Sequence, residues 1–172
     1  MDSDRVILGK SVHNPSAEFD YPTALKRAPE LASTRALLDI WRFHEAEGGM
    51  QMGRDIPSRA LARFLAHITI VEAIDDWADS FVRVAGHALM IRFGRDVTGM
   101  RGSLIFAENE KGHTELCSLS RQAQATREPF FMDSAVVRSG EVLMRMETFH
   151  APIYGPDGSP AWHMGGLFFF DP

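Results

Sequence analysis

The last third of the chain alternates apolar and polar residues in runs that end at short turns, a pattern typical of antiparallel β-strands. The segment between the last two runs, residues 155–160, reads Gly-Pro-Asp-Gly-Ser-Pro. Proline presets one dihedral angle there, and glycine accepts a positive φ. An earlier hairpin is expected around the short turn Asp75-Asp76-Trp77. The expected strands span residues 68–74, 79–86, 130–138, 142–154 and 161–170.

Helical spacing of apolar residues replaces this alternation in other segments. The first segment carries Leu37, Leu38 and Trp41 on one side. It ends at a glycine pair, which accommodates the left-handed turn common at a helix C-terminus. Pro129 closes the last segment, because the residue before a proline disfavours helical geometry. The expected helices span residues 33–47, 58–66, 87–93 and 112–127.

The resulting order is helix, helix, strand, strand, helices and three strands. It predicts an α+β domain, in which a five-stranded antiparallel sheet has helices inserted between its second and third strands and N-terminal helices before it. We divide the chain into an N-terminal arm (1–32), flanking helices (33–66) and the sheet domain (67–172). Within the arm, the apolar residues 6–8 either form a short strand or pin the arm by contact.

Composition limits the possible functions. The chain has 172 residues, of which 45% are hydrophobic, enough for one globular domain with a core. Its 18 basic and 23 acidic side chains give a formal net charge of −5, which disfavours nucleic acid as the main partner. The single cysteine forms no intramolecular disulfide, and the sequence has neither a secretory signal nor a long apolar run. We therefore expect a cytoplasmic protein without membrane insertion.

Short ordered motifs add to this element order. The segments are GRDIPSR at 53–59, ITIVE at 68–72, FVRVAGH at 81–87, GRDVTG at 94–99, HAPI at 150–153, GPDG at 155–158 and GG at 165–166. In this order they resemble the PAS domain superfamily, and in particular the proteobacterial family of short, stand-alone PAS-domain proteins. The resemblance covers about residues 34–170. The arm before it has no counterpart.

This resemblance implies a PAS-like fold and a sensory, signalling or protein-interaction role without catalysis. PAS domains bind small ligands between the sheet and the inserted helices, and they dimerise through sheet faces or N-terminal helices. No residues remain for an output domain, so a sensor of this length is expected to act through an unidentified signalling partner protein. The resemblance identifies no ligand, because fold and function are separable. No cofactor is assigned.

The candidate ligand-binding residues come from both sides of that space. They are His87, Ile91 and Arg92, with Met90 beside them, on the first inserted helix, and Met144, Met146, Trp162 and Met164 on the last two strands. Trp162 and Met164 share strand parity, as do Met144 and Met146. We therefore expect one apolar wall against a small apolar or amphipathic ligand. A packed core or an exposed dimer face fits the same residues.

The stripe of Leu37, Leu38 and Trp41 on the first helix needs a surface to cover. As in PAS-like proteins, such a helix packs on the sheet of its own or of a partner subunit. We take these three residues as the candidate dimerisation element of a homodimer. Packing within the same chain is the alternative.

Histidines supply the competing hypothesis of an enzyme. His150 and His163 flank the last turn and are expected to be cross-strand neighbours, with Glu147 near in sequence. A histidine–carboxylate pair in a cavity suits a small hydratase or isomerase of a cone-shaped α+β fold. More often such residues form a polar pair on a wet sheet face.

His113 and Cys117 have the i, i+4 spacing of metal ligands. No further ligand motif supports them, so no metal site is predicted. The sequence around Cys117 also differs from that of a flavin-binding photosensory PAS domain. We assign no catalytic residue.

Overall fold

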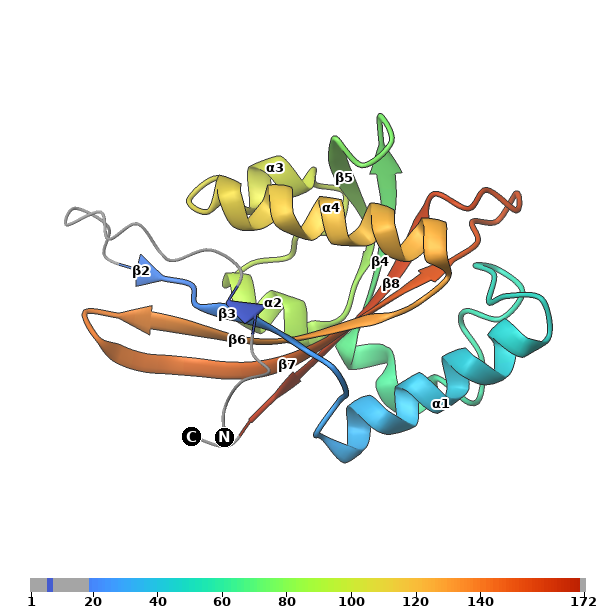
Figure 1. The fold of residues 1–172 in the computed structure, drawn as a ribbon, viewed down its shortest axis with the longest axis horizontal. Coiled ribbons are helices and arrows are strands. Elements are labelled where there is room, and N and C mark those ends of the chain that lie inside the picture. The colour runs from blue at the N-terminus through green and yellow to red at the C-terminus, as the bar shows by residue number, and fades with distance from the viewer. Residues whose placement is uncertain (1–5, 8–18, 171–172) are drawn as a thin grey trace.

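The computed structural model describes residues 6–7 and 19–170, which form an antiparallel sheet with helices on both faces (Figure 1). The sheet has eight strands within these residues, in the spatial order β1-β3-β6-β7-β8-β4-β5, with β2 paired to β6. The strands are β1 (Val6–Ile7), β2 (Phe19–Asp20), β3 (Thr23–Lys26), β4 (Ile68–Ile74), β5 (Asp79–Ala85), β6 (Phe130–Arg138), β7 (Glu141–Ile153) and β8 (Trp162–Phe169).

The five strands from β4 to β8 confirm the predicted α+β arrangement. β4 and β5 form a hairpin, β6 to β8 form a meander, and β8 pairs with β4 so that the two units share one sheet. Helices lie between β5 and β6, as expected between the second and third strands, but the sequence pattern does not predict the short helix Gly102–Ile105 among them.

The sheet extends beyond this core through part of the N-terminal arm. β3 pairs with β6, with Leu25 opposite Met132, and β1 pairs with β3. β1 lies within residues 6–8, for which a short strand is one of the two alternatives that the sequence leaves open. β3 is too short to give a sequence pattern, and it forms because the edge of β6 offers unpaired backbone groups. The remaining predictions for the arm, at 1–5 and 8–18, fall outside the described residues.

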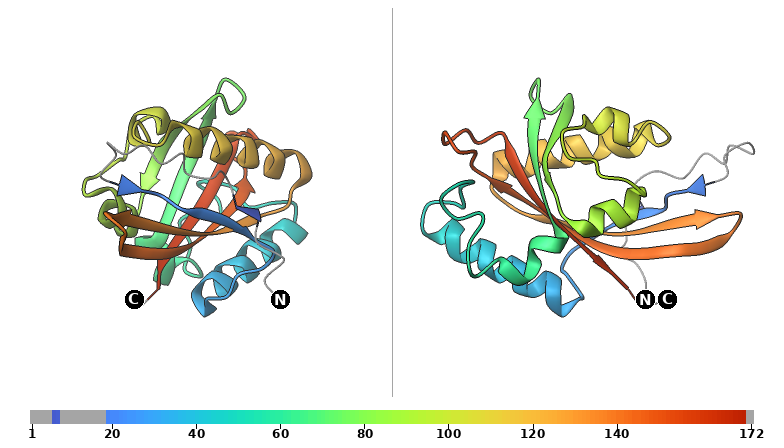
Figure 2. Two further views of the ribbon diagram at one scale, coloured as in Figure 1. Left: turned by 60° about the vertical axis from the view of Figure 1, so that its left-hand side comes forward. Right: turned by 180° about the vertical axis from the view of Figure 1, so that it is seen from behind.

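Helices cover both faces of the sheet (Figure 2). The helical segments are α1 (Ala32–Ala46), the 3-10 helix η1 (Ala62–His67), α2 (His87–Phe93), α3 (Gly102–Ile105) and α4 (Glu110–Thr126). We call the side covered by α2, α3 and α4 the inner face, and the side covered by α1 the outer face. The predicted helix 58–66 is instead a shorter 3-10 helix. No helix among the described residues is long and apolar enough to cross a bilayer.

Residues next to α4 determine where the helix begins and ends. The side chain of Asn109 accepts a hydrogen bond from the Gly112 backbone N–H at 3.2 Å and so caps the helix N-terminus. The helix ends where Arg127 adopts a left-handed conformation, with φ 56°. The Arg127 guanidinium then forms a paired contact with Glu45 of α1, at 2.7 Å for each hydrogen bond. This ion pair links the ends of the helices on the two faces.

The outer face holds the main hydrophobic core. Leu37, Leu38 and Trp41 of α1 pack there, and Phe149 is fully buried beneath them. Gly166 lets α1 approach closely, because a Cβ at that position would lie 2.6 Å from Leu37 Cδ2. Burying several large side chains in this way supplies the principal stabilisation of the sheet, at about 1.5–3 kcal/mol for each.

A buried charge cluster anchors β3 and the start of α1. Glu147, whose side chain is fully buried, accepts hydrogen bonds from Lys26 Nζ at 2.6 Å and from the backbone N–H groups of Glu30 and Leu31. Asp133 lies 3.1 Å from the same ammonium. Burial opposes ionisation of Glu147, but these hydrogen bonds outweigh it and hold the pKa of the carboxyl below its ordinary value.

Candidate functional site

The inner face carries polar side chains where a core would be apolar. Because Gly166 faces α1, its neighbours His163, Gly165 and Leu167 point toward the inserted helices. On β7, His150 belongs to the same face, because it pairs with Gly165. The two histidines are diagonal neighbours on adjacent strands, beneath α4.

Aromatic rings enclose this histidine pair. The rings of Phe130 and His150 stack at 4.6 Å with an interplanar angle of 8°. The His163 ring lies 5.6 Å from that of His150 and 5.7 Å from that of Phe130. Trp77, from the β4–β5 turn, meets His163 edge-on at 5.7 Å, and its indole N–H donates to Gln124 of α4 at 2.7 Å. The turn, the sheet and α4 therefore meet around one imidazole.

Both imidazoles are neutral at physiological pH. Burial disfavours the charged form and lowers the pKa of His150 to about 3. Burial also holds the pKa of His163 well below its ordinary value, and the proximity of His150 lowers it further. Each neutral ring carries one N–H donor and one nitrogen acceptor.

The hydrogen bonding of the two rings differs. Nε2 of His150 lies 2.9 Å from the Thr148 hydroxyl. Neither nitrogen of His163 has a hydrogen-bond partner, although the residue is only 3% exposed. No carboxylate pairs with either ring among the described residues. The enzyme hypothesis needs such a partner for acid–base chemistry. The wet-face alternative does not describe this pair, because His163 is buried and His150 is half-buried under aromatic rings.

A second polar cluster lies where α4 meets β5. His113 Nε2 is 3.4 Å from Cys117 Sγ and 3.5 Å from both Asp79 Oδ1 and Ser80 Oγ. A proton relay from the Cys117 thiol to the Asp79 carboxylate would need both ring nitrogens of His113. Both contacts are made by the same nitrogen, Nε2, so His113 cannot act as such a relay. Burial, with the charge of Asp79 adding to it, raises the pKa of the Cys117 thiol to about 11. The cluster therefore holds an inert thiol, and no group of three metal-ligating side chains occurs in the described part of the chain.

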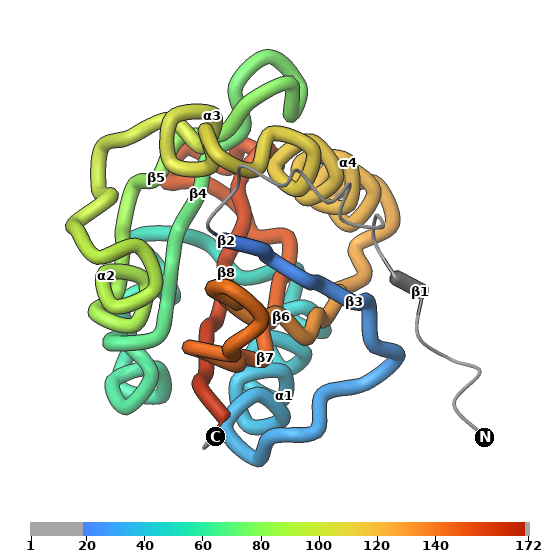
Figure 3. The backbone as a smooth tube through the Cα atoms, turned by 90° about the vertical axis from the view of Figure 1, so that its left-hand side faces the viewer, coloured from blue at the N-terminus to red at the C-terminus, as the bar shows by residue number. Residues whose placement is uncertain are grey.

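β3 runs past α4 on one side of the molecule (Figure 3). A cleft lies between these two elements, beside the histidine pair. The cleft has a volume of about 280 Å³ and lies between β3, the second half of α4 and the start of β6. Its apolar walls include Leu25, Leu119, Ala123, Pro129 and Phe130. Phe130 is thus common to the cleft and to the histidine pair.

Comparison with known proteins agrees with this architecture. A family model for the PAS domain matches residues 30–168. The chain belongs to the PAS domain family. It is accordingly a sensory or interaction module, and family membership points away from catalysis. The match is to the PAS domain as such, so the proteobacterial stand-alone family stays a prediction.

A solved structure described as an RNA-binding Light-Oxygen-Voltage receptor is similar to this PAS domain, at 15% sequence identity and a TM-score of 0.43. The alignment covers 87% of this chain and 38% of the receptor chain, so this PAS domain spans well under half of that protein. No curated protein matches the sequence.

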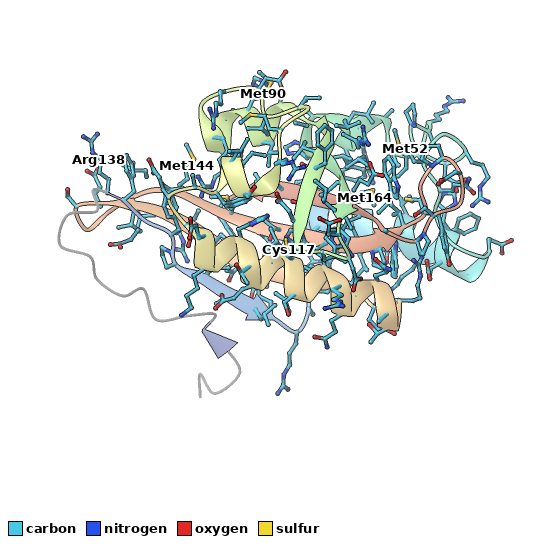
Figure 4. All side chains as sticks on the ribbon, turned by 90° about the horizontal axis from the view of Figure 1, so that it is seen from above. Met52, Met90, Cys117, Arg138, Met144 and Met164 are labelled. Atoms are coloured by element: carbon cyan, nitrogen blue, oxygen red, sulfur yellow. The ribbon has the colours of Figure 1, made fainter. Side chains whose placement is uncertain are left out.

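The four residues of the last two strands that were expected to form one apolar wall lie on two different faces of the sheet. Met144 and Met146 lie on the inner face, near α2. Trp162 and Met164 lie on the outer face in the α1 core. Met144 and Met164 are well separated along the sheet in Figure 4. The reason is the strand register: Met146 pairs with Phe169, so even-numbered residues of β7 share a face with odd-numbered residues of β8.

The candidates on α2 lie at the margin of the inner face. His87 is exposed and Ile91 is 46% exposed. Arg92 is partly buried, with its guanidinium over the rings of Tyr21 and Phe93 at 5.0 and 4.8 Å. These three side chains therefore do not meet the histidine pair beneath α4.

The proposed dimer residues are covered within their own chain. Leu37, Leu38 and Trp41 are 0%, 5% and 3% exposed, and the Trp41 indole donates to the Pro152 carbonyl at 2.9 Å. The helix α1 therefore packs on the sheet of its own chain, which was the alternative to a dimer contact. A homodimer would need a different surface.

Sequence reasoning treated His150 and His163 as separate from the ligand space and did not include Phe130. Their strand parity could have placed both histidines on the same face as Met146. That inference requires the pairing between β7 and β8, which the turn length alone does not fix.

Proposed function

We propose that this PAS domain is a sensor that holds a small ligand between its sheet and α4, against the histidine pair, and signals by changing its contact with a partner protein. The observation that carries the proposal is His163, a buried imidazole whose two nitrogens lack partners.

An unpaired polar group is costly to bury. Leaving a donor or acceptor unsatisfied costs about 1–3 kcal/mol, and buried polar groups in native proteins are therefore nearly always paired. A ligand that hydrogen-bonds to His163 offsets this cost. Ligand binding then couples directly to the free energy of the domain, as a sensor requires.

The surroundings also suit a small molecule. Ligand sites combine apolar and aromatic walls with few polar groups that fix orientation. Here Phe130 and Trp77 supply aromatic surface, and His150 and His163 supply the polar groups. Met146 lies further along the same face, where its flexible side chain adapts to a bound molecule.

A fragment screen tests this function. Purified protein is examined by native mass spectrometry for a retained molecule, and then titrated with a fragment set while backbone amide shifts are recorded. We expect a molecule that perturbs residues of β7, β8 and α4, and that binds about three- to tenfold more weakly in His163→Leu. His67→Leu is the matched control, because that histidine lies at η1 and bonds to the Leu167 carbonyl at 2.9 Å. A protein that retains nothing, and whose inner face responds to no fragment, would contradict the proposal.

A further inference from the structure

The cleft between β3 and α4 has a wall that is also part of the histidine pair. Phe130 lines the cleft, stacks on His150 and touches the ring of His163. Its side chain is only partly buried, whereas His163 behind it is 3% exposed. Movement of this one ring would connect the cleft to the unpaired nitrogens.

The space that Phe130 occupies has the shape of an aromatic ring. The ring centroids of Phe130 and His150 lie 4.6 Å apart, and the two planes differ by 8°. A planar molecule in place of the phenyl ring would keep that stacking, which is worth about 0.5–1.5 kcal/mol beyond area burial. It would also lie against His163, whose ring is 5.7 Å from that of Phe130 at an interplanar angle of 49°.

The charges around the cleft favour an uncharged occupant. Lys26 is the one lysine of the lining, and its ammonium is paired with Glu147 at 2.6 Å. Arg27 and Glu128 are exposed at the rim. Deeper in, the side chains are apolar, such as Leu119, and the imidazoles are neutral. A charged ligand would lose hydration there without gaining a counter-charge.

The hydrogen-bonding groups of His163 restrict the chemical class of the ligand further. Neutral His163 offers a donor on one nitrogen and an acceptor on the other. A hydroxyl on an aromatic ring, or an amide group within the ring, can hydrogen-bond to one of these nitrogens. A plain hydrocarbon leaves the imidazole unpaired.

We propose that the β3–α4 cleft admits an uncharged planar aromatic molecule bearing a hydroxyl or amide group, which displaces the Phe130 ring, stacks on His150 and hydrogen-bonds to His163. This inference rests on the proposed sensory function and adds to it the entrance, the moving side chain and the chemical class of the ligand.

Small aromatic compounds that differ in one substituent test the proposed class of ligand. Phe130→Ala is titrated by calorimetry with phenol, toluene, benzoate and benzylamine, which share a ring and differ in polar group or charge. We expect phenol to bind most tightly, and to bind about three- to tenfold more weakly once His163→Leu is added, since one hydrogen bond contributes about that much. Toluene affinity should be unchanged by the second substitution. Equal phenol affinity with and without His163, or benzoate binding as tightly as phenol, would overturn the inference.

Two further measurements keep the test decisive. Phe131→Ala is the matched control, because Phe131 is the adjacent residue but packs in the outer-face core, and we expect no preference for phenol over toluene there. If Phe130→Ala does not fold, wild-type protein labelled with ¹⁵N at histidine is titrated with phenol. The His163 ring nitrogen shifts should then move and those of His67 should not. Unmoved His163 shifts would overturn the inference, whereas a retained ligand of another class would leave the proposed sensory function standing.

Discussion

Replacing His163 by leucine should stabilise the ligand-free protein. The imidazole is 3% exposed and neither of its nitrogens is hydrogen-bonded. Leucine has a similar volume and buries no polar atom. The folded state therefore loses a desolvation penalty and keeps most of its packing.

The expected size follows from two opposing contributions. Removing the unpaired polar group gains about 2 kcal/mol. Losing the edge-on ring contact with Trp77, at 5.7 Å, costs about 1 kcal/mol. The net gain of about 1 kcal/mol raises the thermal midpoint of a chain of this size by about 2–4 °C.

Urea unfolding at pH 7.5, with thermal scans alongside, measures this change. The control is His67→Leu, because His67 bonds to the Leu167 carbonyl and stacks on Phe168 at 4.8 Å. We expect that substitution to lower the free energy of unfolding by about 1 kcal/mol. If His163→Leu is instead destabilising by as much as the control, His163 has a partner in the folded protein and the reasoning fails.

Other predictions concern pH, the buried charge cluster and the close approach of α1. Because the pKa values of His150 and His163 lie below the unfolded value of about 6.5, the unfolded chain takes up more protons in mild acid. Stability should fall from pH 7 to pH 5 by up to about 1.4 kcal/mol per pH unit for each histidine, and less steeply in His163→Leu; a flat urea profile would refute this. Glu147→Gln should cost about 3 kcal/mol in urea unfolding, since it leaves a buried ammonium without its nearest counter-charge; a neutral effect would show that the cluster is dispensable. Gly166→Ala should cost about 1–3 kcal/mol, because its Cβ would meet side chains at 2.6 and 3.2 Å. Gly165→Ala, whose nearest contact is 3.6 Å, is its control and should be nearly neutral in the same assay.

The order of elements could be predicted from the sequence because its signals are local. The strand Phe130–Arg138 and the helix His87–Phe93 have the predicted bounds. Proline, glycine and aspartate end several of these elements through their own dihedral preferences, and these preferences need no information from the rest of the chain. The same signals carried the resemblance to the PAS domain, which the family match confirms.

The assignment of side chains to faces depended on the tertiary structure. Periodicity shows that Trp162 and Met164 share one face of their strand and that Met144 and Met146 share one face of theirs. Whether the two faces coincide depends on the pairing of the strands, and a shift of one residue reverses the answer. The observed pairing of Met146 with Phe169 separates the two pairs.

The sequence by itself therefore determined the α+β element order and the membership of a sensory family, since both rest on local preferences of short segments. Only the tertiary structure decided that α1 covers its own sheet, that part of the arm extends the sheet through β3, and that His163 is buried without a partner. These three features depend on contacts between segments far apart in the chain. The burial and the hydrogen bonding of a side chain are properties of the whole fold, and they are what turns an ordinary histidine into a candidate binding residue.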